Sequence, residues 1–164
     1  MAKYTPKQFM QQAKSMLVSF PAEAKEGVID SVLAVEQEFD KNFDRQGFFF
    51  QPWQRNKQST IDLKGGSKVL HDSGKLRKSR KVFLTSVGGF GGRISYSAIS
   101  DRTHHDYAAL QQNGFRTSRR SKGIGAPVPA RPFVGNHHVV DSRIRSSLTK
   151  KVFGCLTRNY VIGR

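Results

Sequence analysis

Residues 70–76 read Leu-His-Asp-Ser-Gly-Lys-Leu, with a Gly-Lys pair like that of a nucleotide-binding loop. Such a loop needs a glycine five residues before this pair and a Ser or Thr after it, because these residues cradle the phosphates and bind Mg²⁺. Val69 and Leu76 stand at those two places. The pattern therefore favours a turn, in which Ser73 and Gly74 lead into a strand.

Residues 88–92 read Gly-Gly-Phe-Gly-Gly, a run that could be taken for a dinucleotide-binding fingerprint. That fingerprint needs a helix directly after the glycines, because the helix N-terminus binds the phosphates. Here the segments on both sides, residues 81–87 and 93–99, are rich in β-branched and aromatic residues. The pattern predicts a β-hairpin with a flexible glycine tip, on which Phe90 is exposed.

Two histidine pairs, at residues 104–105 and 137–138, raise the question of a zinc site. No cysteine accompanies them, and neither pair has the i,i+4 spacing of a helical metal site. Asp101 and Asp106, with His105 near them, could suggest acid–base catalysis, but no nucleophile motif or paired carboxylates converge on them. We therefore expect no catalytic site, no metal and no cofactor.

The charge of the chain is unevenly distributed. It has 28 basic and 12 acidic residues among 164, and residues 1–63 hold eight of each sign, so the whole excess of +16 lies in residues 64–164. Such a field favours nucleic acid, an acidic protein surface or an anionic membrane, and charge alone does not choose among them. The basic run at residues 116–122 and the basic cluster at residues 75–81 are either solvated faces or contacts with such a partner.

Two helices are expected in the N-terminal part of the chain. The first begins at Pro6 and ends before Pro21, which interrupts the apolar pattern. The second covers residues 22–45, with Gly47 as its C-cap. Its apolar stripe consists of Val28, Val32, Val35, Phe39 and Phe43.

The rest of the chain alternates loops with short elements. Residues 54–74 are expected to form a long loop with one helical turn near Val69, and residues 106–111 a short strand or a helical turn. Residues 114–127 carry no periodicity and predict a mobile basic loop. The last helix should cover residues 138–153, with an apolar stripe formed by Val140, Ile144, Leu148 and Val152.

These elements predict one α+β domain over residues 1–164, in which two N-terminal helices and one C-terminal helix pack on a small antiparallel sheet. Residues 157–164 would form a C-terminal strand or arm. Cys155 is the single cysteine, which excludes an intrachain disulfide. Neither a signal peptide nor a membrane span is visible, and we expect a chain made in a cytoplasm.

The segment Val128–Gly135 is conformationally restricted. Pro129 and Pro132 fix φ at their own positions and push the residues before them, Val128 and Arg131, toward extended geometry. A basic residue, an aromatic residue and a glycine therefore stand in a defined order on a stiff, non-helical segment. Nothing in this segment is catalytic, and it is typical of a part that must be placed accurately.

Four landmarks follow one another along the chain. They are a helix ending in Phe43 with an aromatic turn to Trp53, residues 70–79, Tyr107-Ala108 followed by Gln112-Asn113-Gly114, and Val128–Gly135 followed by a helix. In this order they resemble the virion-morphogenesis, or tail-completion, family of tailed bacteriophages, best known from Mu-like phages. Its members typically read Leu-x-x-Ser/Thr-Gly-x-Leu-x-x-Ser, then Tyr-Ala-x-x-His-Gln-x-Gly, then Ile-Pro-Ala-Arg-Pro-Phe-Leu-Gly. The resemblance covers roughly residues 39–152.

The resemblance implies a structural protein, not an enzyme, that forms the neck or tail end of a phage. It would assemble as a ring, commonly a hexamer, between the capsid connector and the tail. Its partners would be other copies of itself, connector or neck proteins, and tail tube or sheath proteins, with non-specific contact to genomic DNA. It would lie in the virion, and in the host cytoplasm during assembly, with no membrane contact.

Two departures from the family pattern accompany this resemblance. Gln111 stands where a His is common, and residues 1–20 add a helix that could alter which neighbour the protein contacts.

The expected contact between copies involves Arg131, Pro132 and Phe133, with Arg131 paired to an acidic group of the neighbour. The alternative is an ordinary rigid segment before the last helix, with Phe133 in the core. Phe90 at the hairpin tip would reach the next ring or its lumen.

A basic loop is the second expected site, and it would face DNA or an acidic partner through Arg116, Arg119, Arg120 and Lys122. A rival hypothesis is a stand-alone basic nucleic-acid-binding module, although the sequence has no helix-turn-helix, zinc or single-strand-binding signature.

Overall fold

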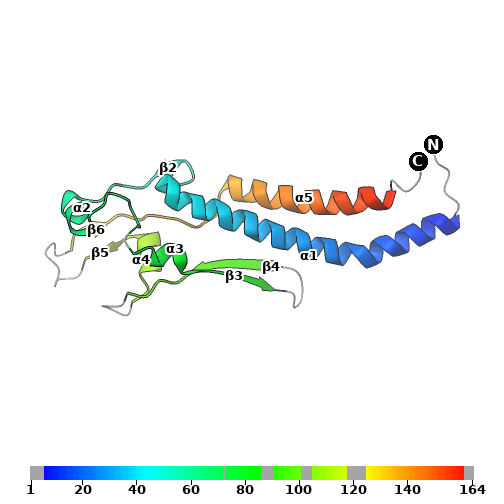
Figure 1. Cartoon of the computed structure of the whole chain (residues 1–164), viewed down its shortest axis with the longest axis horizontal. Coiled ribbons are helices and arrows are strands. Elements are labelled where there is room, and N and C mark those ends of the chain that lie inside the picture. The colour runs from blue at the N-terminus through cyan, green and yellow to red at the C-terminus, as the bar shows by residue number, and fades with distance from the viewer. Residues whose placement is uncertain (1–5, 72, 86–90, 101–104, 118–124, 161–164) are drawn as a thin grey trace. The chain divides into compact units, whose positions relative to one another are not determined.

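The α+β class is confirmed by the computed structural model (Figure 1), which describes residues 6–71, 73–85, 91–100, 105–117 and 125–160. Two long helices lie near the two ends of the chain, with short helices and strands between them. In chain order the elements are α1 Pro6–Arg45, β1 Gly47–Phe48, β2 Gln51–Pro52, α2 Gln58–Lys64, α3 Lys75–Lys78, β3 Arg80–Thr85, β4 Gly91–Tyr96, α4 Tyr107–Asn113, β5 Phe115–Arg116, β6 Pro127–Val128 and α5 His138–Tyr160.

The expected break between two N-terminal helices is absent, because α1 is one helix of 40 residues with Pro21 inside it. A proline within a helix removes one backbone hydrogen bond and commonly bends the helix. Figure 1 shows α1 bending in its blue N-terminal part. The residues on both sides of Pro21 favour helix, so the proline bends α1 without ending it.

The end of α1 also differs from the expectation that Gly47 would cap it. Gln46 takes the left-handed conformation, with φ of 56°. Its side-chain Nε2 donates to the carbonyl of Phe43 at 2.6 Å, and its Oε1 accepts from the N–H of Val69. Gln46 therefore satisfies an end carbonyl of the helix and ties it to the loop that carries Val69, while Gly47 begins β1.

The strands form three separate two-stranded sheets instead of one small sheet. β1 pairs antiparallel with β2, β3 pairs with β4, and β5 pairs antiparallel with β6. The predicted hairpin therefore exists as β3 and β4, while its glycine tip and Phe90 lie outside the described residues. β5 and β6 form the base of the predicted basic loop.

Three other elements refine the expectations. Residues 54–74, which were expected to form a loop, contain the helix α2. The segment expected to be a short strand or a helical turn, residues 106–111, contributes to the helix α4. α5 extends to Tyr160, so the expected C-terminal arm is helical at its start, and residues 161–164 lie outside the described part.

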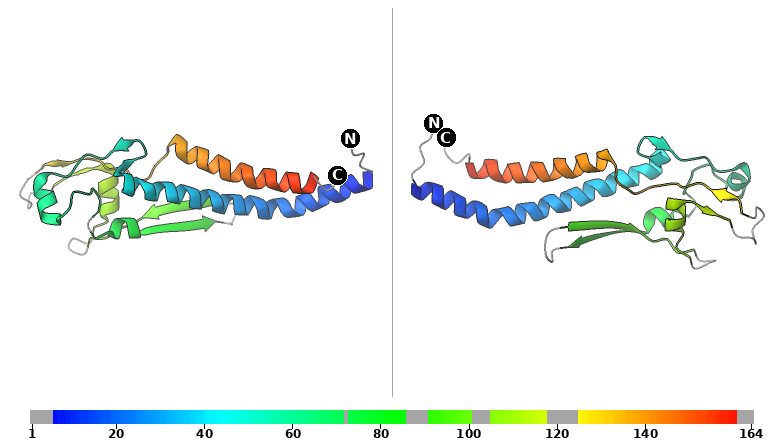
Figure 2. Two further views of the ribbon diagram at one scale, coloured as in Figure 1. Left: turned by 45° about the horizontal axis from the view of Figure 1, so that its top comes forward. Right: turned by 180° about the vertical axis from the view of Figure 1, so that it is seen from behind.

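Two compact units can be distinguished in the chain. Unit 1 contains residues 1–36, 82–93 and 137–164, and unit 2 contains residues 37–81 and 94–136. In unit 1, α5 lies antiparallel beside α1 (Figure 2). The hydroxyl of Ser31 donates to the carbonyl of Ile144 at 3.4 Å, and Lys151 Nζ lies 3.0 Å from Glu26 and 3.4 Å from Asp30.

Unit 2 is built around a cluster of aromatic and aliphatic side chains. Phe43 is the common contact: its ring centroid lies 5.8 Å from that of Trp53, 5.5 Å from that of Phe133 and 6.1 Å from that of Tyr96. Such ring pairs add to the free energy gained by burying apolar surface. The buried members of the cluster are Phe43, Trp53, Val69, Leu76, Ala98, Ala108 and Phe133.

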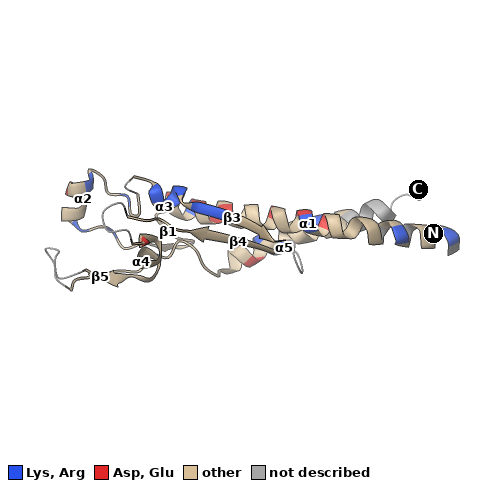
Figure 3. Ribbon diagram, turned by 90° about the horizontal axis from the view of Figure 1, so that it is seen from below, with Lys and Arg blue, Asp and Glu red and all other residues tan. Residues whose placement is uncertain are grey.

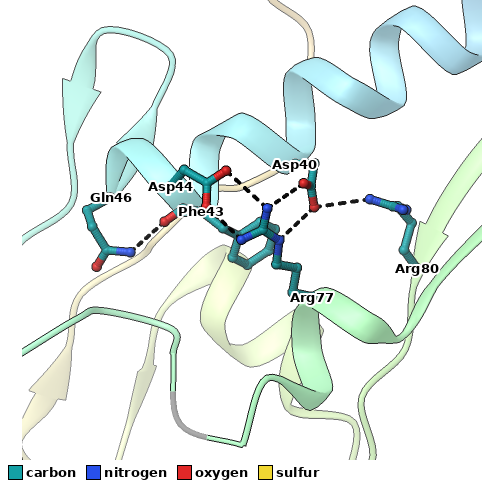
Figure 4. Close-up of polar contacts among 6 residues, drawn as sticks. All are labelled: Asp40, Phe43, Asp44, Gln46, Arg77 and Arg80. Carbon is teal, nitrogen blue, oxygen red and sulfur yellow. Dashed lines mark hydrogen bonds and ion pairs between the residues drawn. The ribbon is translucent and has the colours of Figure 1, made fainter. Parts of the chain in front are cut away.

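Arg77 on α3 is held by two carboxylates of α1 in unit 2 (Figure 4). Its Nε donates to Asp40 Oδ1 at 2.8 Å and its Nη2 donates to Asp40 Oδ2, while Nη1 and Nη2 donate to the two oxygens of Asp44 at 2.7 and 3.0 Å. Arg80 also donates to Asp40, at 3.1 Å. The Arg77 hydrogen bond is the main reason that the pKa of Asp40 lies below its ordinary value.

Replacing Asp40 by Asn should destabilise the protein by about 1 kcal/mol at neutral pH, because the charge that pairs with Arg77 and Arg80 is lost. Since the folded-state pKa of Asp40 is lowered, its contribution is complete at neutral pH and is lost as the pH falls through that pKa. The difference between D40N and the parent should therefore shrink in acid. Urea unfolding from pH 7 downward measures it.

Asp62→Asn is the matched control, because Asp62 is exposed and, among the described residues, accepts from the Gln58 amide alone, at 2.8 Å. This variant should unfold like the parent at every pH. A D40N deficit that stays constant as the pH falls would contradict the role of the Asp40 charge.

Candidate functional site

The segment Val128–Gly135 is held by its backbone. Three successive carbonyls, those of Pro132, Phe133 and Val134, each accept a hydrogen bond from a different side chain. The donors are Trp53 Nε1 to Pro132 at 2.7 Å, Asn42 Nδ2 to Phe133 at 3.2 Å, and Gln112 Nε2 to Val134 at 2.7 Å. A buried carbonyl without a partner is costly, so these donors fix the path of the segment.

Both polar atoms of the Gln112 side-chain amide form hydrogen bonds with the segment. While Nε2 donates to Val134, Oε1 accepts from the N–H of Phe133 at 3.0 Å. The neighbouring backbone adds a bond from the Arg131 N–H to the Gln111 carbonyl at 2.8 Å. The C-terminal end of α4 and the proline-bracketed segment therefore form one hydrogen-bonded unit.

Gly114 permits this close approach. Its φ of 75° is in the left-handed region, and a Cβ there would lie 2.8 Å from the Ala130 nitrogen and 2.9 Å from the Val128 carbonyl oxygen. Both distances are too short for a side chain, so only glycine fits between α4 and the segment.

The interface residues expected from the sequence lie as follows. Phe133 is 2% exposed and belongs to the core cluster of unit 2, Pro132 is half-buried, and Arg131 is 8% exposed. Within one chain this is the rigid segment with Phe133 in the core. Contact of the same segment with a second copy stays a prediction, and Phe90 lies outside the described residues.

Most of the expected basic loop also lies outside the described residues. Arg119, Arg120 and Lys122 belong to residues 118–124, which the structure does not describe. Arg116 is exposed on β5, and its Nη1 donates to the carbonyl of Gly125 at 3.3 Å. Its role toward DNA or an acidic partner stays a prediction.

Arg131 is buried against polar groups of its own chain. Its Nη2 donates to Asn56 Oδ1 at 3.1 Å and to the Gln54 carbonyl at 3.4 Å. Burial lowers the pKa of Arg131, although a guanidinium stays protonated at any ordinary pH. Its Nε is buried and has no hydrogen-bond partner in the described part of the chain.

The other motifs that could do chemistry have structural roles where they are described. Asp106 is the N-cap of α4, and its Oδ1 accepts from the Ala108 N–H at 2.9 Å and the Ala98 N–H at 3.1 Å. Gly74, with φ of 73°, precedes the four-residue helix α3, which leads into β3. No group of three His, Cys, Asp or Glu side chains could hold a metal ion among the described residues.

The basic cluster at residues 75–81 is partly neutralised. Figure 3 shows Lys and Arg gathered on α3 and the start of β3. Arg77 and Arg80 of this cluster pair with Asp40, and Arg77 pairs also with Asp44. These two arginines therefore form ion pairs within unit 2.

Sequence analysis missed Asn42, which is fully buried and binds both the Phe133 carbonyl and, through Oδ1, the Phe49 N–H at 2.9 Å. A signal for it exists in the sequence. Asn42 stands seven residues after Val35, so it shares the buried face of α1 with the apolar stripe. A polar residue at such a position must have specific partners, although the pattern does not name them.

Comparison with known proteins adds no family: no protein-family model, no curated protein and no solved structure matches the chain. Among the described residues, no helix combines the length and apolar character needed to cross a membrane.

Replacing Gln112 by Ala should cost about 2 kcal/mol of unfolding free energy, because the Val134 carbonyl and the Phe133 N–H both lose their partner. Asn113→Ala is the matched control, since Asn113 is the next residue along α4 and is exposed. Chemical unfolding of both variants measures the effect. Equal stability of the two variants would show that Gln112 does not hold the segment.

Proposed function

We propose that this chain is a structural virion protein of a tailed bacteriophage. It would be a tail-completion or neck protein that oligomerises as a ring between the capsid connector and the tail. The observation that carries the proposal is the bonding of the Pro132, Phe133 and Val134 carbonyls to side chains of α1, the aromatic turn and α4. Elements that resemble the family motifs therefore make direct contact with one another.

The core of unit 2 supports the same proposal. Each of the four landmarks contributes a buried side chain to one cluster: Phe43 and Trp53, then Leu76, then Ala108, then Phe133. Residues that meet in one core explain why the motifs occur together and in order. They define one shared scaffold, which suits a protein that acts by assembling.

Exposed apolar side chains on the N-terminal part of α1 support contact with other proteins. Leu17 and Val18 are 76% and 80% exposed, and Met10 is 59% exposed. Apolar groups gathered on one surface helix commonly mark a protein–protein contact. This is the part of the chain that the family pattern does not include, so it offers a surface for a neighbour particular to this protein.

The positive charge of the chain affects how copies could assemble. Each copy carries a formal net charge of +16. Copies in a ring repel one another unless an acidic partner or DNA neutralises them, so assembly should depend on that partner. A ring around the path of the genome would bind its phosphates without reading their sequence.

Deleting the gene from the phage that encodes it should leave heads and tails that accumulate unjoined, because the ring between them is missing. Electron microscopy of the lysate measures the fraction of joined particles. Supplying the chain from a plasmid is the control, and it should restore joining. Normally joined virions in the absence of the chain would refute the proposal.

The purified chain gives a second test against the rival nucleic-acid-binding module. We expect light scattering coupled to size-exclusion chromatography to detect a ring, or a monomer that assembles when connector or tail proteins are added. A chain that stays monomeric with those proteins and binds duplex DNA with a steep salt dependence would favour the rival.

A further inference from the structure

Two arginines of unit 2 differ in how their charge is satisfied. Arg77 donates through Nε, Nη1 and Nη2 to two carboxylates. Arg131 is more deeply buried, yet within the described part of the chain it donates only through Nη2, to an amide oxygen and a carbonyl. No carboxylate pairs with it among the described residues. A buried charge is normally paired, and the described residues do not supply the anion that the burial of Arg131 calls for.

Arg131 also lies beside open space. A hollow of about 690 Å³ and a smaller one of about 250 Å³ share three lining residues, Lys64, Gln111 and Arg131. Arg55 and Lys57 line the larger hollow as well, and no Asp or Glu stands among the described residues that line either hollow. The surroundings of Arg131 are therefore cationic, and the missing anion has room to enter.

Gln111 supplies the second polar group. Its Oε1 is buried and accepts no hydrogen bond in the described part of the chain. Because the Arg131 N–H donates to the Gln111 carbonyl, the two residues are held next to each other. A ligand that enters the hollow and satisfies both side chains must present an anionic oxygen to the Arg131 guanidinium and a hydrogen-bond donor to the Gln111 amide.

An acidic residue in a protein segment has this combination. Its carboxylate offers anionic oxygens, and the backbone offers N–H donors within a few ångströms of them. The larger hollow also has an apolar wall, formed by Ala126, Pro127, Val128 and Pro129, which suits the aliphatic stem of a glutamate. Its volume exceeds what a single phosphate group would fill, and the phosphodiester group of a nucleic acid has no hydrogen-bond donor for Gln111.

We propose that the larger hollow, which Arg131, Gln111 and Lys64 help to line, is a binding site for an Asp or Glu side chain of a partner protein. Arg131 pairs with the carboxylate, Gln111 accepts from the neighbouring backbone, and Lys64 adds long-range attraction. The proposal rests on the proposed function only for the statement that this partner is a virion protein. The chemistry of the site belongs to the chain itself.

Nuclear magnetic resonance of the full-length ¹⁵N-labelled chain tests the site at the atom concerned. The probe is the acetylated, amidated tripeptide Gly-Glu-Gly, with Gly-Gln-Gly as its neutral match and sodium chloride at equal ionic strength as the salt control. We expect a saturable shift of the Arg131 Nε–H resonance with the glutamate peptide. The glutamine peptide should bind about tenfold more weakly, because it lacks the charge.

Two outcomes would overturn the proposal. The first is an Arg131 resonance that responds no more to the glutamate peptide than to the glutamine peptide or to salt. The second is saturation by inorganic phosphate without saturation by the glutamate peptide, which would make the hollow a phosphate site.

Variants of exposed lysines test the site without changing a buried residue. Arg131→Gln removes the charge but alters a buried position, so its melting temperature must be checked. Lys64→Ser changes an exposed residue and should weaken glutamate-peptide binding about two- to fivefold through the lost attraction. Lys68→Ser, an exposed lysine outside both hollows, is the matched control. Equal affinity of K64S and K68S would refute the role of Lys64.

The two proposals fail separately. Absence of peptide binding would remove the carboxylate site and leave the head–tail joining experiment unchanged. Normal joining of particles without the chain would remove the proposed function and leave the peptide titration as a valid measurement of the site.

Discussion

The hydrogen bonds from Trp53, Asn42 and Gln112 to three successive carbonyls are the constraint on which unit 2 depends. The core cluster supplies apolar burial, but burial alone has no direction and would permit several arrangements of an extended segment. The three donors select one of these arrangements, because each carbonyl accepts a hydrogen bond from a different side chain. Phe133 then occupies the centre of the cluster as a consequence of how its backbone is held.

Two buried or half-buried arginines of unit 2, Arg77 and Arg131, differ in whether a carboxylate of the described chain pairs with them. Arg77 donates four hydrogen bonds to Asp40 and Asp44, so it contributes to holding α3 against the end of α1. Arg131 is buried with no such pair among the described residues, and further cations line the hollow beside it. The net charge of the sequence therefore does not describe one surface: part of it is used in ion pairs within unit 2, and part has no carboxylate partner in the described part of the chain.

The sequence predicted those features that depend on local patterns. The apolar stripes of α1 and α5, the strands of the β3–β4 hairpin and the rigidity of the proline-bracketed segment follow from periodicity and from fixed dihedral angles. Features that depend on distant partners were not predictable. Gln46 takes the cap position expected for Gly47 and also accepts from the N–H of Val69, and Asn42 finds its acceptor 91 residues away. The error at Pro21 is local instead, because residues that favour helix on both sides of a proline can keep the helix continuous. For the candidate site, the residue types were visible, whereas the hollows and the missing partner of Arg131 required the fold.

Holding a segment by its carbonyls has a consequence for how the protein can change over time. The bonds to Pro132, Phe133 and Val134 involve atoms that every amino acid possesses, so they do not depend on the side chains at the outer positions of the segment. Substitutions at Val128 or Ala130 can therefore change the outer surface of the segment while the three carbonyl hydrogen bonds are kept. The side chains at these positions are thus free to diverge one at a time, independently of the bonds that fix the backbone.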